Sequence, residues 1–529
     1  MKVVTKSEME YIDRETSNVY KIPSTLLMEN AGIAITYKIM EIYPQIVKST
    51  NNTVIVGPGN NGGDGLVIAR QFLTQKIPVQ IIIIGNRDKF NGDPLINLEI
   101  SEKLNIPLKF ICSLKEWEMQ EQNIFSSFII IDAIFGTGLK DKVKDLFNNI
   151  IQSINKNKLS KVISVDIPSG MLSIEDKQNE TIIFADDTIT VGLPKIGMVD
   201  YPGKSYVGKL HIVNIGFPET LLTDKQIHTN LITLDMVKNI LPKRQSNTHK
   251  GDFGHVLVIA GSKKYTGAAI LTCKSALRSG CGLVTLASVA TVCSTLRNQF
   301  PEAICMELPE TNDGYISSES FSLISHNLSS YQTVIIGPGL GQSPSTKELL
   351  DDLLINYTGK VVIDADGINL LSQNLDLLKK SKCEIILTPH LKEMSRLMNK
   401  TINEIKSNKI AYSREFSKKY NIVLCLKSAV TLISDSNGEL YYNTTGNEGM
   451  STGGTGDVLT GIIAGLMAQG VGVLESTILG TYIHGLTGDY VKLNSSSQTL
   501  IASDIINNLH HAFNKLNSEN LNEKVLFYE

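Results

Sequence analysis

The sequence of 529 residues has few features of membrane, secreted or nucleic-acid-binding proteins. Its longest apolar runs, such as residues 81–84, are far shorter than the ~20 residues that span a bilayer. The mixed-charge N-terminus does not resemble a secretory signal. A formal net charge of −3 gives no electrostatic reason to bind nucleic acid or an anionic membrane. The seven cysteines show no C-x-x-C spacing and no H-E-x-x-H motif occurs, so we expect reduced thiols, no zinc site and a cytoplasmic protein.

The composition is typical of an ordinary globular protein, with 42% hydrophobic and 19% charged residues. A chain of this length is expected to form two or more domains. Short buried-strand patterns alternate with helical patterns along the chain, which predicts an α/β fold with parallel sheets. A polar, irregular stretch at residues 218–230 is expected to separate two domains, residues 1–220 and residues 221–529.

A glycine-rich turn follows the first predicted strand. We expect a helix at residues 23–42, a strand at 53–56, a turn at 57–65, a helix from 66 to about 73 and a strand at 79–84. The turn satisfies G-x-G-x-x-G, but Ile84-Gly85-Asn86 stands where an acidic residue would hold a ribose. The usual dinucleotide-binding mode is therefore not expected. Asn60, Asn61 and Asp64 could instead ligate a cation or hold a sugar or amide group, or they could form a structural turn.

Two further strand ends in the first half carry aspartates. Residues 128–131 form a predicted strand that Asp132 ends, and residues 162–165 form another that ends in Asp166 and leads to Ser169. Ligands bind beyond the carboxyl ends of strands in open parallel sheets, so these residues and the 57–65 turn predict one shared polar site. Each aspartate alone could equally be a cap or turn residue. We interpret Lys195 and Lys204 as solvated loop charges, because the sequence around Lys204 does not complete a phosphate-binding loop.

A second glycine-rich turn, at residues 446–461, is the strongest site motif in the chain. Glycines and small hydroxyl residues lead into a helix with a buried stripe, so its unpaired backbone N–H groups are expected to bind an anion. Asp457 falls in the first turn of that helix. A carboxylate beside a phosphate is repulsive unless it has a chemical task, such as taking a proton from a hydroxyl that attacks phosphorus. The structural alternative is that Asp457 caps the helix.

Four other strand ends of the second half are expected to converge on this turn. They are residues 337–341, residues 364–367, residues 388–390 and residues 427–431. His390 thereby becomes a candidate ligand contact, although a lone histidine is most often an ordinary loop residue. Lys427 could neutralise a phosphate, although a lone lysine at a strand end is usually just exposed. The second half is therefore predicted to bind a phosphoanhydride.

Together these motifs resemble a known family. The 59–65, 132–138 and 166–170 motifs are similar to those of NAD(P)H-hydrate epimerase domains. The 337–341, 388–390 and 453–457 motifs are similar to those of ADP-dependent NAD(P)H-hydrate dehydratases, which have a ribokinase-like fold. Over nearly the whole chain, the order of the motifs resembles that of bifunctional NAD(P)H-hydrate repair enzymes. The resemblance implies a Rossmann-like three-layer α/β/α domain followed by a ribokinase-like α/β domain.

The resemblance implies repair of NADH and NADPH that carry water added across a ring double bond. The first domain would interconvert the R and S hydrates. The second would dehydrate the S hydrate with ADP, giving NAD(P)H, AMP and phosphate. The implied cofactors are K⁺ and Mg²⁺, with ADP as co-substrate. The implied partners are these small molecules, with no nucleic acid and no membrane, and a homo-oligomer is expected.

The family pattern also implies roles for individual residues. In the first domain the hydrate contacts would be Asn60, Asn61, Gly62, Gly63, Asp64, Gly136, Thr137, Gly138, Leu139, Lys140, Asp141, Lys142 and Asp166. Potassium would be held by Asn61, Asp132 and Ser169, whose oxygens suit such a cation. In the second domain the hydrate contacts would be Ala268, Gly339, Gly341, His390 and Asp457, and the nucleotide contacts Lys427, Ser428, Ala429, Val430, Thr431 and Gly456. Asp457 is the expected base of dehydration, and Asp132 or Asp166 the expected proton-transfer group of epimerisation.

Two departures from the family pattern and two other functions have to be weighed. Ser428 and Lys392 stand where the family often carries glycine, which could alter affinity without removing a catalytic group. The chain could be a ribokinase-like small-molecule kinase, acting on a sugar or hydroxymethyl-pyrimidine, with a dinucleotide-binding regulatory domain. It could also be a dinucleotide sensor that binds without turnover. The first-half motifs count against the kinase, and the intact Asp457 turn counts against the sensor.

Overall fold

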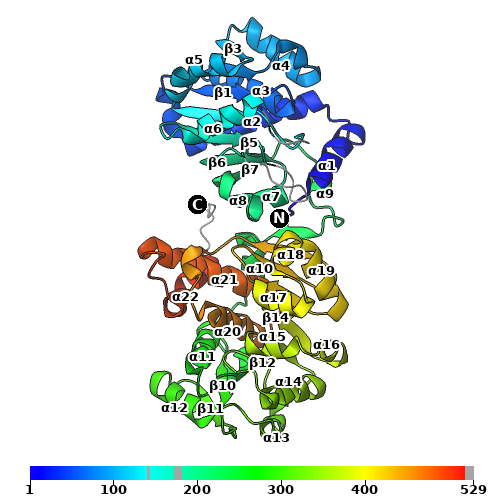
Figure 1. Cartoon of the computed structure of the whole chain (residues 1–529), viewed down its shortest axis with the longest axis vertical. Helices are drawn as coiled ribbons and strands as arrows, with labels where there is room; N and C mark the ends of the chain where they lie inside the picture. The colour runs from blue at the N-terminus through cyan, green and yellow to red at the C-terminus, as the bar shows by residue number, and fades with distance from the viewer. Residues whose placement is uncertain (140–142, 144, 172–180, 519–529) are drawn as a thin grey trace. The chain divides into compact units, whose positions relative to one another are not determined.

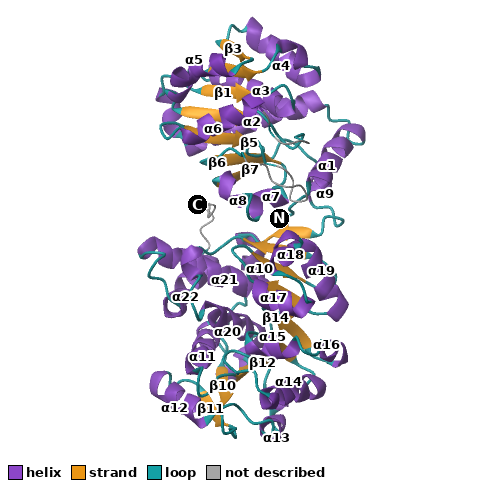
Figure 2. Cartoon of the chain, in the orientation of Figure 1, coloured by secondary structure: helices purple, strands orange, loops and turns teal. Residues whose placement is uncertain are grey.

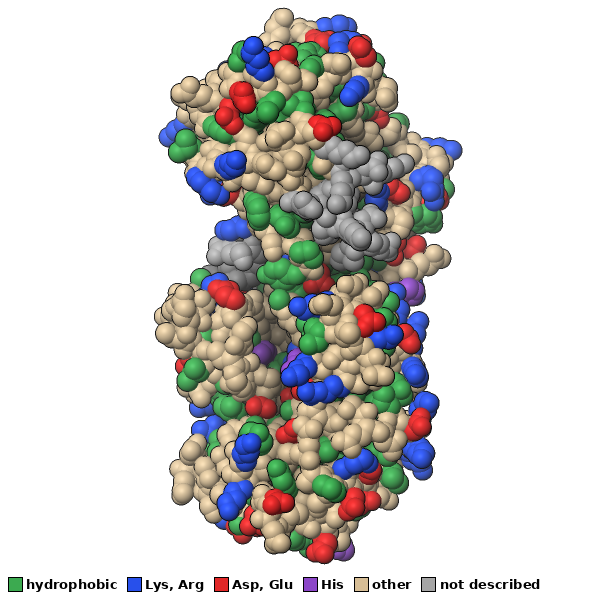
Figure 3. Space-filling model, viewed as in Figure 1, with side chains coloured by type: hydrophobic (Ala, Val, Ile, Leu, Met, Phe, Trp, Pro, Cys, Tyr) green, Lys and Arg blue, Asp and Glu red, His purple; other side chains and the backbone are tan. Residues whose placement is uncertain are grey.

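The computed structural model describes residues 1–139, 143, 145–171 and 181–518 (Figure 1). The chain forms two compact units that divide between Ile227 and His228. We refer to Lys2–Ile227 as the N-terminal unit and to the residues from His228 onwards as the C-terminal unit. Within the described ranges, no helix is both long and apolar enough to span a bilayer. Acidic and basic side chains are interspersed on the face drawn in Figure 3.

Seven strands form the sheet of the N-terminal unit: β1 (Thr53–Val56), β2 (Gln80–Ile84), β3 (Leu108–Ile111), β4 (Ile129–Ala133), β5 (Lys161–Val165), β6 (Asp187–Val191) and β7 (Lys209–Val213). Neighbouring strands pair in parallel in the order β3-β2-β1-β4-β5-β6-β7. The chain runs outward from β1 on one side of the sheet and from β4 on the other. Such a reversal leaves a crevice beyond the carboxyl ends of β1 and β4, where ligands bind.

Helices cover both faces of this sheet and so make three layers (Figure 2). Successive strand residues point to opposite faces, so Val54 packs in one core and Ile55 in the other. The first core includes Phe72 of the helix after β1, and the second includes Trp117 of the helix after β3. The helices are α1 (Lys6–Asn18), α2 (Ser24–Ile42), α3 (Asn60–Thr74), α4 (Gly92–Lys103), α5 (Leu114–Phe125), α6 (Asp145–Lys156), α7 (Ile196–Val199), α8 (Lys204–Val207) and α9 (Glu219–Leu222).

Ten strands form the sheet of the C-terminal unit: β8 (Thr229–Leu231), β9 (His255–Ile259), β10 (Leu283–Ser288), β11 (Ile304–Glu307), β12 (Thr333–Ile336), β13 (Lys360–Ile363), β14 (Glu384–Leu387), β15 (Val423–Leu426), β16 (Thr431–Ser434) and β17 (Leu440–Asn443). Their order is β11-β10-β9-β12-β13-β14-β15-β16-β17-β8. Only the β15–β16 and β16–β17 pairs are antiparallel. The short strand β8 closes one edge by pairing with β17.

The helices of this unit are α10 (Leu234–Ile240), α11 (Thr266–Arg278), α12 (Ala290–Gln299), α13 (Ser320–Ser325), α14 (Pro344–Asn356), α15 (Asp366–Leu371), α16 (Asp376–Lys380), α17 (Leu391–Met398), α18 (Ile402–Ser407), α19 (Lys409–Tyr420), α20 (Thr455–Ala468), α21 (Val473–Asn494) and α22 (Ala502–Asn517). Helix α20 follows the 446–461 turn and is buried along nearly its whole length. It packs against α11 without gaps, because Gly461 and Gly465 leave no room for a Cβ beside Ser275 and Ser279. The two helices therefore lie in close contact along the middle of α20.

The two α/β domains confirm the predicted fold class, but one predicted boundary is wrong. Helix α3 begins at Asn60, with Gly59 as its N-cap, and not at residue 66. Its glycines serve close packing: a Cβ on Gly62 would lie 1.8 Å from the Gly57 carbonyl oxygen, and a Cβ on Gly63 would lie 2.5 Å from Met28 Sδ. Asn60 to Asp64 therefore belong to the first turns of a helix, not to a flexible turn.

Candidate functional site

The N-terminal unit has a large cavity at the carboxyl ends of its strands. Its volume is about 1050 Å³. Polar residues from the ends of β1, β2 and β5 line it, together with Asp13 of α1. The cavity therefore lies at the sheet edge where the strand order predicts a ligand.

An acidic cluster with one lysine occupies part of this cavity. The ammonium of Lys195 forms an ion pair with Asp166 and also donates to Thr190 Oγ1 at 2.8 Å. Lys195 is only 7% exposed, so its interpretation as a solvated loop charge is wrong. Burial, followed by the charge of Asp166, raises the pKa of Asp13 to about 6, and the same causes raise the pKa of Asp64 well above its ordinary value. Three carboxyl groups thus share one cation, and burial disfavours the ionised forms of Asp13 and Asp64.

Asp132 has a different environment and does not line the cavity. It is fully buried and accepts hydrogen bonds from Ser164 Oγ (2.8 Å), Ser169 N (2.9 Å), Ser169 Oγ (2.5 Å) and Ile134 N (3.3 Å). These bonds tie the loop after β4 to the loop after β5. Of the two aspartates expected to transfer protons, only Asp166 reaches the cavity; Asp132 organises the loops behind it.

Asn61 carries an unsatisfied buried side chain. Neither its Oδ1 nor its Nδ2 has a hydrogen-bond partner within the part of the chain that the structure describes. A Cβ on Gly136 would lie 3.3 Å from Asn61 Oδ1, so the 136–139 loop passes directly over this amide. Phe135, the neighbour of Gly136, donates its backbone N–H to Ser169 Oγ at 2.8 Å, which links this loop to the Asp132–Ser169 pair. An orphaned amide oxygen is the kind of oxygen ligand that a potassium ion uses.

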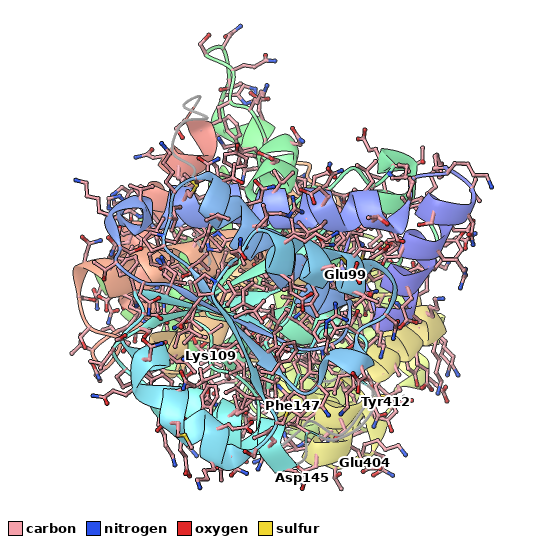
Figure 4. The ribbon with its side chains drawn as sticks, turned by 90° about the horizontal axis from the view of Figure 1, so that it is seen from above. Glu99, Lys109, Asp145, Phe147, Glu404 and Tyr412 are labelled. Carbon is pink, nitrogen blue, oxygen red and sulfur yellow. The ribbon has the colours of Figure 1, made fainter. Side chains whose placement is uncertain are left out.

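The other residues expected to contact the hydrate fall into three groups. Asn60, Asp64, Gly136, Thr137, Gly138 and Leu139 line the cavity, as do Asn61 and Asp166. Gly62 and Gly63 do not, because the packing of α3 holds both against the protein interior. Lys140, Asp141 and Lys142 lie outside the described residues. Past this loop, the cavity-lining residues Asp145 and Phe147 begin α6 (Figure 4), and the Phe147 ring packs on Phe135 with centroids 4.7 Å apart.

In the C-terminal unit, the start of α20 has the geometry of an anion site. The N-cap, Gly454, has a φ of 93° and contributes no side-chain hydrogen bond. Asp457 lies in the first turn, and its carboxylate accepts no hydrogen bond from the residues that the structure places. Burial, followed by the charge of Asp364, raises the pKa of Asp457 to about 7. Asp457 is therefore not a helix cap but an unpartnered acid that titrates near neutral pH.

A buried ion pair holds the cation next to this acid. Asp364, at the end of β13, is 1% exposed and accepts from Lys427 Nζ at 2.8 Å and from Thr460 Oγ1 at 2.7 Å. Lys427 Nζ would lie 3.2 Å from a Cβ on Gly456, at the start of α20. Burial opposes the charge of Lys427, but the carboxylates of Asp364 and Glu393 more than offset it and raise the pKa of the ammonium. Asp364 was expected at this sheet edge but without a role; its position directly after a buried strand was the available signal.

His390 is held in one tautomer beside Lys427. Its Nδ1 accepts from the backbone N–H groups of Lys392 and Glu393, both at 3.1 Å, and so caps α17. Burial and the charge of Lys427 lower the pKa of the ring. The neutral ring therefore carries its proton on Nε2, which becomes a hydrogen-bond donor.

The remaining predicted contacts lie in two turns. A Cβ on Gly339 would lie 3.2 Å from Ala268 Cβ, so this turn and the start of α11 are adjacent, and Gly341 N donates to Asp366 Oδ2 at 2.9 Å. Ser428, Ala429 and Val430 lie in the turn between β15 and β16, which the bond from Ser428 Oγ to Val430 O (2.5 Å) tightens, and Thr431 begins β16. His484 was not predicted from the sequence. Its Nε2 is buried without a partner in the described chain, and burial lowers the pKa of its ring to about 4.

Comparisons with known proteins cover both units. Residues 256–511 match the family model described as NAD(P)H-hydrate dehydratase, and residues 24–197 match that of the YjeF-related protein N-terminus. The bifunctional NAD(P)H-hydrate repair enzyme Nnr of Moorella thermoacetica is 35% identical over 519 residues, 98% of each chain. The protein of the same name from Escherichia coli is 28% identical over 510 residues, 95% of this chain and 92% of its own. A solved structure, the ADP/ATP-dependent NAD(P)H-hydrate dehydratase of Bacillus subtilis co-crystallised with ATP and Mg²⁺, is 27% identical with a TM-score of 0.47, covering 54% of this chain and 98% of its own.

The fold and the two sites define a two-domain α/β enzyme, with a Rossmann-like domain followed by a ribokinase-like domain. Its chemistry is built at the carboxyl edges of two mainly parallel sheets. The chain belongs to the family of bifunctional NAD(P)H-hydrate repair enzymes. It combines an NAD(P)H-hydrate epimerase with an ADP-dependent NAD(P)H-hydrate dehydratase, and a small-molecule kinase with a regulatory domain is not favoured.

Proposed function

We propose that residues 1–220 carry the epimerase and residues 221–529 the dehydratase, each working at the site described above. Water adds to an enamine at the carbon bonded to nitrogen, so the hydroxyl of the hydrate stands next to the ring nitrogen. Epimerisation then requires the hydroxyl to leave as water, with the ring nitrogen forming a C=N bond, and water to return from the other face. Asp166, paired with Lys195, exchanges the proton in both directions. Asn60, Asn61, Asp64, Thr137 and their neighbours in the cavity wall hold the hydrate.

Potassium is the cation that we assign to Asn61, Asp132 and Ser169. The support is the orphaned Asn61 amide next to an oxygen-rich pair of buried side chains. When bound, the ion would supply positive charge that holds the hydrate and the loop over it. We expect epimerisation to weaken when potassium is replaced by lithium, and we expect Asn61→Ala to remove this dependence.

In the dehydratase, Asp457 takes the proton of the hydroxyl while the hydroxyl oxygen attacks the β-phosphorus of ADP. AMP leaves from the other side of that phosphorus, so the hydrate becomes a phosphate ester. The C–O bond of the ester then breaks, phosphate leaves, and loss of a proton from the neighbouring carbon restores the ring double bond. The N–H groups at the start of α20 and the Lys427 ammonium stabilise the transferred group. Magnesium held with the diphosphate would offset its charge.

The assignment of Asp457 as the base rests on one observation. Its unpartnered carboxylate has a pKa of about 7 and lies at the start of a helix that can bind an anion. The test is incubation of mixed hydrate epimers with ADP, Mg²⁺ and K⁺, following the return of reduced-nicotinamide absorbance. Full recovery of both epimers is expected, and omission of ADP should abolish it. A stable phosphorylated product from ATP and a sugar or pyrimidine would instead identify a kinase. We also propose that the enzyme acts in the cytoplasm. We propose further that it forms a homo-oligomer, and gel filtration with light scattering would measure its oligomeric state.

A further inference from the structure

The epimerase cavity is long enough to hold a whole dinucleotide. Its lining extends from Asp166 and Lys195, beyond β5, to Asn86 and Lys89, beyond β2. These strands stand three steps apart in the order β2-β1-β4-β5, which is about 14 Å at the usual strand spacing. That distance is comparable to the length of an extended dinucleotide.

The two ends of the cavity differ in chemistry, which orients the ligand. The Asp166 end has the acidic cluster and Lys195, so it suits the hydrated ring. Between the ends lies the start of α3, a helix of 15 residues without a side-chain cap, which suits the diphosphate. The adenosine ribose then falls at the end of β2, as in other sheets with this strand order.

The β2 end carries donors where a carboxylate would hold an unmodified ribose. Asn86 Oδ1 accepts from the Cys112 thiol at 2.7 Å, which leaves its Nδ2 donors for a ligand. The aliphatic stem of Lys89 lies against Gly85, with Cδ 3.9 Å from the position of a Cβ there, and its ammonium forms no ion pair with any described residue. Arg87, by contrast, is committed to Glu102, with Nε–Oε1 and Nη2–Oε2 distances of 3.0 Å.

We propose that Lys89, assisted by Asn86, is the specificity-determining residue for a phosphate on the 2′-oxygen of the adenosine ribose. The epimerase site therefore prefers NADPH hydrate to NADH hydrate. An acidic residue at the end of β2 would repel the 2′-phosphate, whereas the ammonium of Lys89 and the amide donors of Asn86 attract it. Asp93, which also lines the cavity, accepts a hydrogen bond from Thr25 Oγ1 at 2.6 Å. The proposal rests on the proposed function of the epimerase site.

The test measures epimer interconversion by the full chain without ADP, using purified R hydrates of NADPH and NADH and separating the epimers by chromatography. For Lys89→Ala we expect kcat/KM for NADPH hydrate to fall about 10- to 100-fold, the size of one charge-assisted hydrogen bond, with NADH hydrate unchanged. Asn86→Asp, like Lys89→Ala, should lower the ratio of NADPH hydrate turnover to NADH hydrate turnover. Lys103→Ala, an exposed lysine of α4 outside the cavity lining, is the matched control and should leave the ratio unchanged.

Fluorescence of Trp117, the single tryptophan of the chain and part of the core of the N-terminal unit, reports whether that unit is folded in each variant. Equal losses for both hydrates in Lys89→Ala, or a wild-type enzyme that favours NADH hydrate, would overturn the proposal. Wild-type enzyme that interconverts neither hydrate would refute the epimerase function on which the proposal rests, and is thereby distinguished from a failure of specificity alone.

Discussion

Replacing Asp457 with Asn should make the C-terminal unit more stable while removing dehydration. Burial and Asp364 raise the pKa of Asp457 from 3.8 to about 7, so the fold disfavours the ionised carboxylate. Between those values the native state binds more protons than the unfolded state, and stability falls as the pH rises through this window and stays reduced above it. This pKa difference corresponds to a loss of about 4 kcal/mol in the free energy of unfolding at pH values above the folded-state pKa. The figure is an upper one, because neighbouring acids also respond to the change. Asn removes the charge and therefore the penalty.

The assay is urea unfolding of the full chain at about pH 5 and about pH 8, together with dehydration of pure S hydrate. The stability gained by Asp457→Asn should be less than about 2 kcal/mol at the lower pH and several kcal/mol at the higher, at most about 4. Asp376→Asn is the control: this exposed carboxylate meets Lys379 Nζ at 3.1 Å, and its loss should change stability by less than about 1 kcal/mol at either pH. A loss of stability at both pH values would show that the buried charge is not disfavoured. Surviving dehydration would show that Asp457 is not the base.

Three further substitutions probe the ion pairs and the helix start. Lys195→Met should slow epimerisation about tenfold or more, because Asp166 loses its partner, while dehydration of pure S hydrate in the same sample is retained. Lys427→Ala should lower the free energy of unfolding by about 3 kcal/mol, because buried Asp364 is left unpaired. It should also raise the Kd for ADP, measured by calorimetry; unchanged ADP binding would argue against a nucleotide contact. Gly454→Ala should destabilise the fold in chemical denaturation, because the φ there is 93° and a Cβ would lie 2.6 Å from Leu271 Cδ1. Gly453→Ala is the control and should not destabilise it, because a Cβ at Gly453 would have no atom within 4 Å.

The sheets could be predicted from the sequence because their strands are short apolar runs bounded by glycine turns. The strand predicted at residues 53–56 agrees with β1 residue for residue. The parallel arrangement then places the polar strand ends on one edge without further information. For the same reason Asp166, Lys427 and Asp457 could be named from their positions in the chain.

The parts that could not be predicted depend on contacts between distant segments. Lys195 reads as a loop charge until β5 and β6 pair and place it against Asp166. Asp13 belongs to α1, whose sequence contains nothing to connect it with a cavity more than a hundred residues further along, at Asp166. The early start of α3 could not be predicted, because glycine disfavours helices locally. Glycine is required at positions 62 and 63 only because the helix packs closely against Gly57 and Met28.

The small edge strand β8 has a practical consequence for anyone who isolates the dehydratase. Asn230 of β8 pairs with Tyr441 of β17, and its amide donates to Glu439 Oε2 at 2.9 Å and to Leu440 O at 3.1 Å. A protein trimmed to begin at β9 would leave the ladder groups of β17 bare, and bare strand edges recruit other molecules. Precipitation of such a shortened enzyme would then reflect a missing three-residue strand and not faulty chemistry, and a freestanding dehydratase should keep every residue from His228 onwards.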